Sequence, residues 1–266
     1  MVQRVKKALA PRHRLQKIGT VQGYDFAHLG TSYGGWTFVN HPSLQGSVII
    51  SAGVGEDVSF DVAFARKFDA RVILVDPTPR AIAHYESLAK RFGQPSSCPY
   101  DQRGGNQPVE AYDLSGIGPS QLSLVPMALW NESTSLRFFL PPDSDSVSCS
   151  IVNYQSDYRQ DTDHIEVDAV PLDQLLERHQ IDSSELPLLK LDIEGAEIEV
   201  LEDLLAKGIT PLQILVEFDE LGAPSRRARQ RVDSVDSSLV EHGYKCVYTD
   251  GQTDFLFVLE RAFNAS

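Results

Sequence analysis

Apolar residues form short continuous runs that alternate with segments in which they recur at helical spacing. A continuous run is typical of a strand buried on both faces, as in a parallel sheet. The runs that predict strands are 47–50, 71–75, 122–129, 186–191 and 212–216, with a closing antiparallel pair at 244–248 and 255–259. The predicted helices are 56–68, 78–91, 172–179, 196–207 and 224–242. This alternation predicts an α/β fold, with a doubly wound, Rossmann-like and mostly parallel seven-stranded sheet.

Two parts of the chain fall outside this alternation. Residues 93–120 are rich in Gly, Pro, Ser and Asn without periodicity, which predicts a long loop. Strand-like alternation at 135–140, 146–152 and 165–170 predicts a small β insertion at about 135–170. We therefore expect an N-terminal extension, residues 1–46, packing on a main domain that spans 47–266.

Composition excludes several classes of protein. No apolar run approaches the roughly 20 residues of a membrane helix. The three cysteines lie far apart, form no CxxC pair and are odd in number, which argues against a disulfide framework or a zinc cluster. We therefore expect a cytoplasmic protein without a transmembrane segment.

Charge is unevenly distributed. The first 17 residues hold six Lys or Arg and no acid, so the rest of the chain carries 18 basic and 37 acidic groups, a balance of −19. A body this negative argues against nucleic acid as a partner. We expect the basic arm to be a solvated, partly helical and removable segment, with contact to an acidic surface or a membrane as the alternative.

The first strand–loop–helix unit carries Gly53 and Gly55, and the second predicted strand ends at Asp76. Glycines let a ligand approach the backbone, and an acid about 20 residues later suits the hydroxyl groups of a ribose. The dinucleotide fingerprint would need a third glycine where Val58 stands, and no phosphate-binding Gly-Lys-Ser/Thr follows. The loop thus predicts a site for one nucleoside without a pyrophosphate, although Asp76 could instead serve as a helix N-cap.

Carboxylates follow the predicted strands at 186–191 and 212–216. Asp192 and Glu194 are two residues apart, so on an extended strand they share a face. Glu217 follows the next strand. Ligands of open parallel sheets bind at this carboxyl edge, and paired acids there need water, a metal, a cation or a proton between them. Glu197, in the first helical turn, is expected only to complement the helix dipole.

The segment Leu189-Lys190-Leu191-Asp192-Ile193-Glu194-Gly195-Ala196-Glu197 resembles the "LKiDvEGaE" signature of the FkbM-type methyltransferases. Val170-Pro171-Leu172-Asp173 resembles the motif before it, and Ile214-Leu215-Val216-Glu217 resembles the strand after it. The resemblance implies a class I methyltransferase domain that uses S-adenosylmethionine. It also implies O-methylation of a small-molecule or glycan-like acceptor, because family members commonly methylate hydroxyl groups.

The glycine loop departs from the usual family pattern, because Ser51 and Asp57 stand where an acid and a glycine are common. With Asp76-Pro77-Thr78-Pro79 and Tyr33-Gly34-Gly35-Trp36, it resembles a variant subgroup. The cofactor-binding residues that this implies are Gly34, Gly35, Ser51, Gly53, Gly55, Asp76, Pro77, Ala128, Trp130 and Asp192, with Trp130 ending the third strand where it could stack on adenine.

Asp192 is the expected base, and Glu194 or Glu217 would bind the acceptor or a divalent metal, although the histidines show no metal-ligand spacing. Two alternatives stay open at this point. One is a non-catalytic binding protein with the same fold, which the departures at Ser51 and Asp57 would fit. The other is a nucleotide-binding Rossmann oxidoreductase, for which the chain lacks the full glycine fingerprint.

Overall fold

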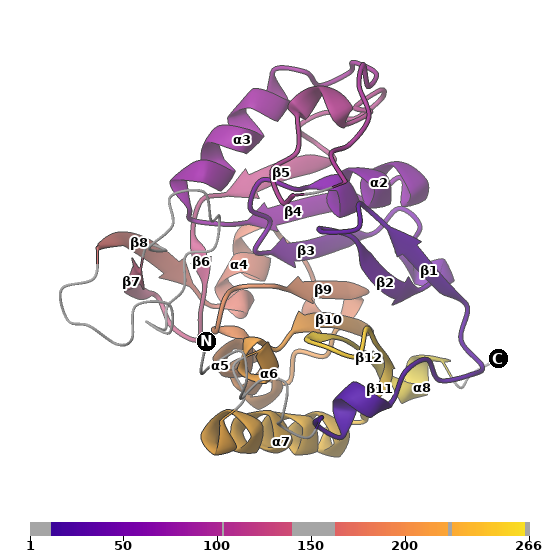
Figure 1. Ribbon diagram of the computed structural model, residues 1–266, viewed down its shortest axis with the longest axis vertical. Coiled ribbons are helices and arrows are strands. Elements are labelled where there is room, and N and C mark those ends of the chain that lie inside the picture. The colour runs from indigo at the N-terminus through magenta and orange to yellow at the C-terminus, as the bar shows by residue number, and fades with distance from the viewer. Residues whose placement is uncertain (1–11, 103, 140–162, 223–224, 264–266) are drawn as a thin grey trace.

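A mixed seven-stranded sheet forms the centre of the computed structural model, which describes residues 12–102, 104–139, 163–222 and 225–263 (Figure 1). Its strand order is β11-β12-β10-β9-β3-β4-β5. The bounds are β3 (Val48–Ala52), β4 (Arg71–Val75), β5 (Leu122–Val125), β9 (Leu188–Leu191), β10 (Gln213–Glu217), β11 (Tyr244–Thr249) and β12 (Asp254–Leu259). The neighbours from β10 to β5 pair in parallel, whereas β12 is antiparallel to both β10 and β11. The predicted closing pair is confirmed, because a short turn can join only antiparallel strands.

Helices cover both faces of this sheet. On one face, alternate strand residues such as Ile50 and Leu189 pack with α4 (Leu172–Arg178), α5 (Glu197–Ala206) and α7 (Arg226–Glu241). On the other, Ile49 and Leu188 pack with α2 (Ser59–Phe68) and α3 (Pro79–Ala89). Burial on both faces explains why the strands read as continuous apolar runs. The architecture is compatible with the expected Rossmann-like fold. The shorter helical elements are α6 (Asp219–Gly222), α8 (Glu260–Phe263), η1 (Leu15–Lys17), η2 (Pro42–Leu44), η3 (Val109–Ala111) and η4 (Ser183–Glu185).

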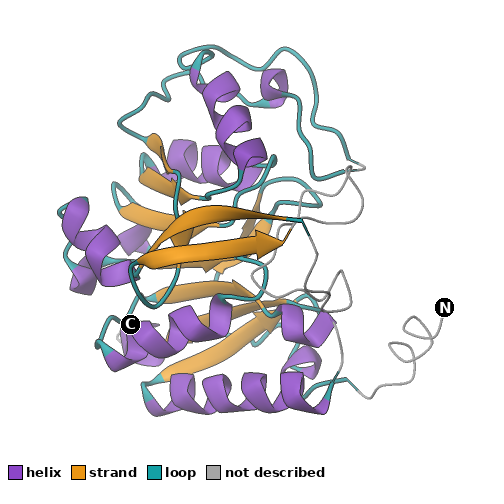
Figure 2. Ribbon diagram, turned by 90° about the vertical axis from the view of Figure 1, so that its left-hand side faces the viewer, coloured by secondary structure: helices purple, strands orange, loops and turns teal. Residues whose placement is uncertain are grey.

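The strand predicted at 122–129 is wrong as a single element. β5, the edge strand of the main sheet, ends at Val125, and Pro126 follows, which has a fixed φ and no N–H for further strand pairing. The chain then enters a separate three-stranded sheet with the order β6-β8-β7. This sheet consists of β6 (Ala128–Leu129), β7 (Thr134–Phe139) and β8 (His164–Val170), and Figure 2 shows its two longer strands in front of the main sheet. The strand predicted at 146–152 lies outside the described residues.

Two helices also begin two or three residues later than predicted. Helix α2 begins at Ser59 rather than at 56, because Glu56 forms a bridge with Asn106 and the Asp57 side chain accepts the Ser59 N–H at 2.9 Å. Helix α7 begins at Arg226, capped by the Ser225 side chain, which accepts the Ala228 N–H at 3.0 Å. Among the described helices none is long and apolar enough to cross a bilayer.

The N-terminal residues contact the main sheet and its helices. The hairpin of β1 (Phe26–Leu29) and β2 (Trp36–Val39) is tied to β10 by Gln213, whose amide exchanges two 2.8 Å hydrogen bonds with the backbone of Val39. Leu15 is buried, and Arg14 pairs with the buried Asp236 of α7. The expectation of a solvated, removable basic arm is therefore wrong for residues 13–15, whereas the domain boundary at residue 46 stays a prediction.

Candidate active site

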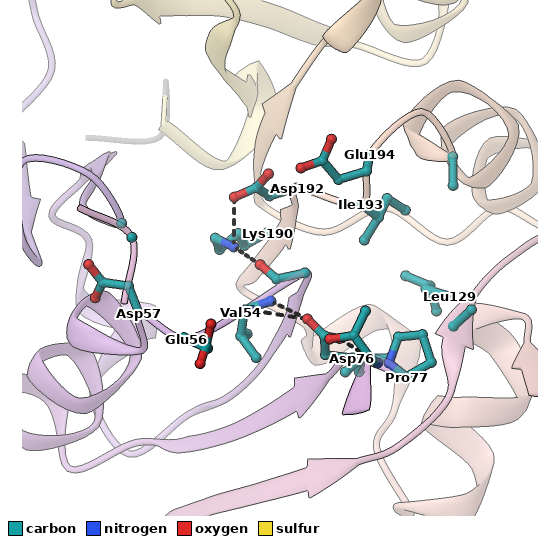
Figure 3. A pocket seen from close by; sticks show the side chains of 18 of the residues that line it. Val54, Glu56, Asp57, Asp76, Pro77, Leu129, Lys190, Asp192, Ile193 and Glu194 are labelled. Atoms are coloured by element: carbon teal, nitrogen blue, oxygen red, sulfur yellow. Dashed lines mark hydrogen bonds and ion pairs between the residues drawn. The ribbon is translucent and has the colours of Figure 1, made fainter. Parts of the chain in front are cut away.

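An open cavity lies at the carboxyl ends of β3, β4 and β9 (Figure 3). Its volume is about 860 Å³, including the solvent-filled opening. This is the edge of the sheet at which the sequence predicted a ligand. The residues that line the cavity are Tyr33, Gly34, Trp36, Gly53, Val54, Gly55, Glu56, Asp57, Val75, Asp76, Pro77, Thr78, Gly105, Ala128, Leu129, Phe138, Lys190, Asp192, Ile193, Glu194 and Ala196.

The glycine loop after β3 is shaped by two close contacts. Gly53 has a φ of +73°, and a Cβ there would lie 1.6 Å from the carbonyl oxygen of Asp192. The backbone N–H groups of Val54 and Gly55 both donate to Oδ2 of Asp76 at 3.0 Å. Oδ1 of Asp76 accepts the Thr78 N–H at 2.8 Å and its hydroxyl at 2.7 Å. Asp76 therefore fixes the glycine loop and also caps the turn into α3.

The hairpin turn between β1 and β2 forms another wall, and Asp57 anchors it. The hydroxyl of Thr31 donates to Oδ2 of Asp57 at 2.6 Å and accepts the Gly34 N–H at 3.0 Å. A Cβ on Gly34 would lie 2.7 Å from Cγ of Asp57, so the turn approaches too closely for a larger residue. Asp57, which departs from the usual glycine, thus holds Gly34 at the cavity.

Lys190 is a site residue to which the sequence analysis gave no role. It lies in the centre of β9 and is 3% exposed, with its Nζ 5.3 Å from the centre of the Trp36 ring. Nζ donates to the carbonyl oxygen of Gly53 at 2.6 Å and lies 3.4 Å from Oδ2 of Asp192 (Figure 3). An ammonium group in a buried strand needs such partners, so the lysine within Leu188-Leu189-Lys190-Leu191 was the available signal.

Asp192 and Glu194 both line the cavity, although not for the predicted reason. Strand β9 ends at Leu191, and Glu194 has a φ of +55°, so the two-residue periodicity of a strand does not extend to it. The loop turns instead, and Figure 3 shows the Glu194 carboxylate directed toward Asp192. Their convergence results from the turn after β9 and not from an extended strand.

Glu217 is not among the residues that line the cavity. Burial, together with the neighbouring Asp192, raises the pKa of Glu217 to about 9, and a hydrogen bond joins the two side chains. The hydroxyl of Thr253 donates to Oε1 of Glu217 at 2.8 Å. At neutral pH, Glu217 is therefore a protonated acid.

Asp219 and Asp254 also lie close to the cavity carboxylates. Burial and the neighbouring Glu194 raise the pKa of Asp219 to about 8. Burial and Asp250 raise the pKa of Asp254 to about 7, with Asp192 adding to the effect. Within the described part of the chain, no group of three or more His, Cys, Asp or Glu side chains is arranged to hold a metal ion. The divalent metal therefore has no candidate ligand set there.

The other predicted cofactor-binding residues divide into two groups. Gly34, Gly53, Gly55, Asp76, Pro77, Ala128 and Asp192 line the cavity. Gly35, Ser51 and Trp130 do not: Ser51 is fully buried in β3, and Trp130 packs on the apolar side of the small sheet. The aromatic ring that the small sheet contributes to the cavity is Phe138 of β7, which no sequence signal identified.

Comparison with models of known protein families gives a match to the methyltransferase FkbM domain over residues 40–246. No curated protein and no solved structure matches the chain. The matched region includes the β3–α2 loop, Asp76 and the turn that carries Asp192 and Glu194. It covers well over half of the sequence, so the chain belongs to the FkbM methyltransferase family.

Proposed function

We propose that this protein is an S-adenosylmethionine-dependent methyltransferase that methylates a hydroxyl group of a small-molecule or sugar acceptor. The observation that carries the proposal is the charge of the cavity. Among the described residues, five carboxyl side chains line it, from Glu56, Asp57, Asp76, Asp192 and Glu194, against the single ammonium of Lys190. The lining is thus strongly negative even with Glu56 paired to Arg80 at 2.6 Å.

This charge separates the candidate ligands. S-adenosylmethionine carries a sulfonium and an ammonium against one carboxylate, a net charge of +1, whereas a dinucleotide carries a pyrophosphate. A unit charge 4 Å from another contributes about 4 kcal/mol at an effective dielectric constant of 20. A lining of this sign favours the cationic cofactor and disfavours the oxidoreductase alternative.

The shape of the cavity supports a nucleoside as well. Val75, Pro77, Ala128, Leu129 and Phe138 give it an apolar side suited to a purine ring. Asp76 lies beside them at the end of β4, and it already accepts four hydrogen bonds. A ribose hydroxyl would share a carboxylate oxygen of Asp76 with the loop amides.

When bound, S-adenosylmethionine supplies an electrophilic methyl group on its sulfonium. Methyl transfer to a hydroxyl then depends on positioning and on removal of the hydroxyl proton. Asp192 is the proposed proton acceptor because it borders the cavity, whereas Glu217 is already protonated at neutral pH. Glu194 is proposed to bind the acceptor.

Calorimetry with S-adenosylmethionine, S-adenosylhomocysteine and NAD tests the proposal. We expect micromolar binding of S-adenosylhomocysteine, about −8 kcal/mol, and no measurable binding of NAD. Tight binding of NAD alone would instead support the oxidoreductase. If S-adenosylmethionine binds but no methyl group reaches any of a panel of hydroxyl acceptors, the non-catalytic alternative is favoured.

A further inference from the structure

Glu197, the first residue of α5, is fully buried and turned back onto the preceding loop. Its Oε1 accepts the backbone N–H of Ile193 at 2.7 Å, and its Oε2 accepts that of Gly195 at 3.0 Å. The two oxygens thus bind the backbone amides on both sides of Glu194. The expectation that Glu197 only complements the helix dipole is wrong, because that effect needs neither burial nor these two bonds.

The loop that Glu197 binds adopts an unfavourable backbone conformation. Glu194 has a φ of +55° in the left-handed region, which a residue with a side chain adopts only when its surroundings enforce it. The start of the loop is fixed separately, by the Asp192 N–H donating to the carbonyl oxygen of Ala52 at 3.1 Å. From Ile193 onward, the side chain of Glu197 supplies the acceptors that the turning backbone lacks.

Burial of this carboxyl group is itself unfavourable. Burial, with Asp219 and Glu220 nearby, raises the pKa of Glu197 above its usual range. An apolar residue at the start of α5 would avoid that penalty but would leave two loop N–H groups without an acceptor. The arrangement is therefore explained by what the loop carries into the cavity, namely Asp192 and Glu194.

We propose that Glu197 is a positioning residue, which sets the place of Asp192 and Glu194 in the cavity through its bonds to the Ile193 and Gly195 amides. The local part of this proposal stands on the hydrogen bonds alone. Its consequence for ligand binding rests on the proposed function, in which Asp192 and Glu194 contact the cofactor or the acceptor.

Amide hydrogen exchange measured by NMR tests the local part. In the unmodified protein, the Ile193 and Gly195 amides should exchange slowly, like the Val200 amide, which donates to the carbonyl oxygen of Ala196 at 3.1 Å. In Glu197→Ala, the first two amides should exchange at least ~10-fold faster relative to Val200, because their buried acceptor is lost. Glu197→Gln keeps one acceptor oxygen, so protection should fall at one of the two amides.

Glu202→Gln is the matched control, because Glu202 lies on the same helix with an exposed side chain. It should change neither exchange rate. If Glu197→Ala fails to fold, the isosteric Glu197→Gln still decides the outcome. Fast exchange of the Ile193 and Gly195 amides in the unmodified protein, or unchanged protection in Glu197→Gln, would overturn the proposal.

Calorimetry with S-adenosylhomocysteine tests the consequence for binding. Glu197→Gln should weaken the affinity by on the order of 10-fold, because a displaced loop also moves Ile193 and Ala196, which line the cavity, whereas Glu202→Gln should leave it unchanged. If Glu197→Gln loses amide protection but binds as before, the residue shapes the loop without positioning the site, and the proposal fails. If even the unmodified protein does not bind S-adenosylhomocysteine, the proposed function fails, while the exchange data still decide the local role.

Discussion

Replacing Asp76 by Asn should reduce both the stability of the fold and the affinity for the cofactor. Asn has nearly the shape of Asp, but one of its two oxygens becomes an NH₂ group, which only donates. In Asp76 each oxygen accepts two hydrogen bonds, from Val54 and Gly55 on one side and from the N–H and hydroxyl of Thr78 on the other. In either orientation, the NH₂ group of Asn therefore faces two hydrogen-bond donors, either the Val54 and Gly55 amides or the amide and hydroxyl of Thr78.

The magnitude follows from these contacts. Hydrogen bonds to a charged group contribute about 1.5–3 kcal/mol each, and two that share one oxygen are not additive, so we expect a loss of about 3 kcal/mol in the free energy of unfolding. For a chain of this size, that loss lowers the melting temperature by roughly 6–12 °C. The affinity for S-adenosylhomocysteine should fall about 10- to 100-fold, because the loop loses its shape and the ribose loses its carboxylate.

Asp182→Asn provides a matched control. Asp182 makes the same local contacts with Ser184, accepting its N–H at 2.9 Å and its hydroxyl at 2.7 Å, but it is exposed and accepts no bond from a distant loop of the described chain. Denaturant unfolding and calorimetry on both variants separate the turn contact, which they share, from the bonds to the glycine loop. Equal losses of stability in the two variants, with unchanged affinity in Asp76→Asn, would refute the role assigned to Asp76.

Three further expectations concern other parts of the molecule. Deleting residues 1–17 should lower the free energy of unfolding by at least about 2 kcal/mol, because buried Leu15 is lost, and deletion of residues 1–11 is the control. Since the native pKa of Glu217 is about 9 against an ordinary 4.5, stability should fall as the pH rises between these values, and denaturation of Glu217→Gln should show a weaker pH dependence. Asp192→Asn should keep the fold and cofactor binding but lower turnover ~100-fold or more, and normal turnover of this variant would show that Asp192 is not the base. Methyl transfer that is insensitive to EDTA would remove any metal role.

Prediction from the sequence succeeded where one local signal determined the structure. The run at 71–75 coincides with β4, and Thr78 with Pro79 begins α3 as expected. It failed where a single residue interrupted a longer pattern, as Pro126 does between β5 and β6. A proline inside an apolar run was visible, but its consequence, a change of sheet, depends on the pairing of β6 with β8.

The candidate site was predictable in location and not in its supporting contacts. Strand ends and glycines indicated the edge of the sheet, because these features are local. The position of Lys190 over Trp36 and the presence of Phe138 in the cavity join elements that the sequence does not order in space. The bonds of Glu197 to the Ile193 and Gly195 amides are local, but they depend on the turn of the backbone at Glu194, which the strand-like pattern did not predict.

The paired carboxylates needed a proton, a cation, water or a metal, and the structure supplies two of these. Behind Asp192 stands Glu217, and beside Glu194 stands Asp219, with pKa values of about 9 and about 8 that keep both protonated at neutral pH. Lys190 adds a positive charge 3.4 Å from Asp192. A protonated acid donates a hydrogen bond where a second carboxylate would repel. The protonated acids therefore lie behind Asp192 and Glu194, which line the cavity, and this division between similar side chains results from burial together with the neighbouring carboxylates.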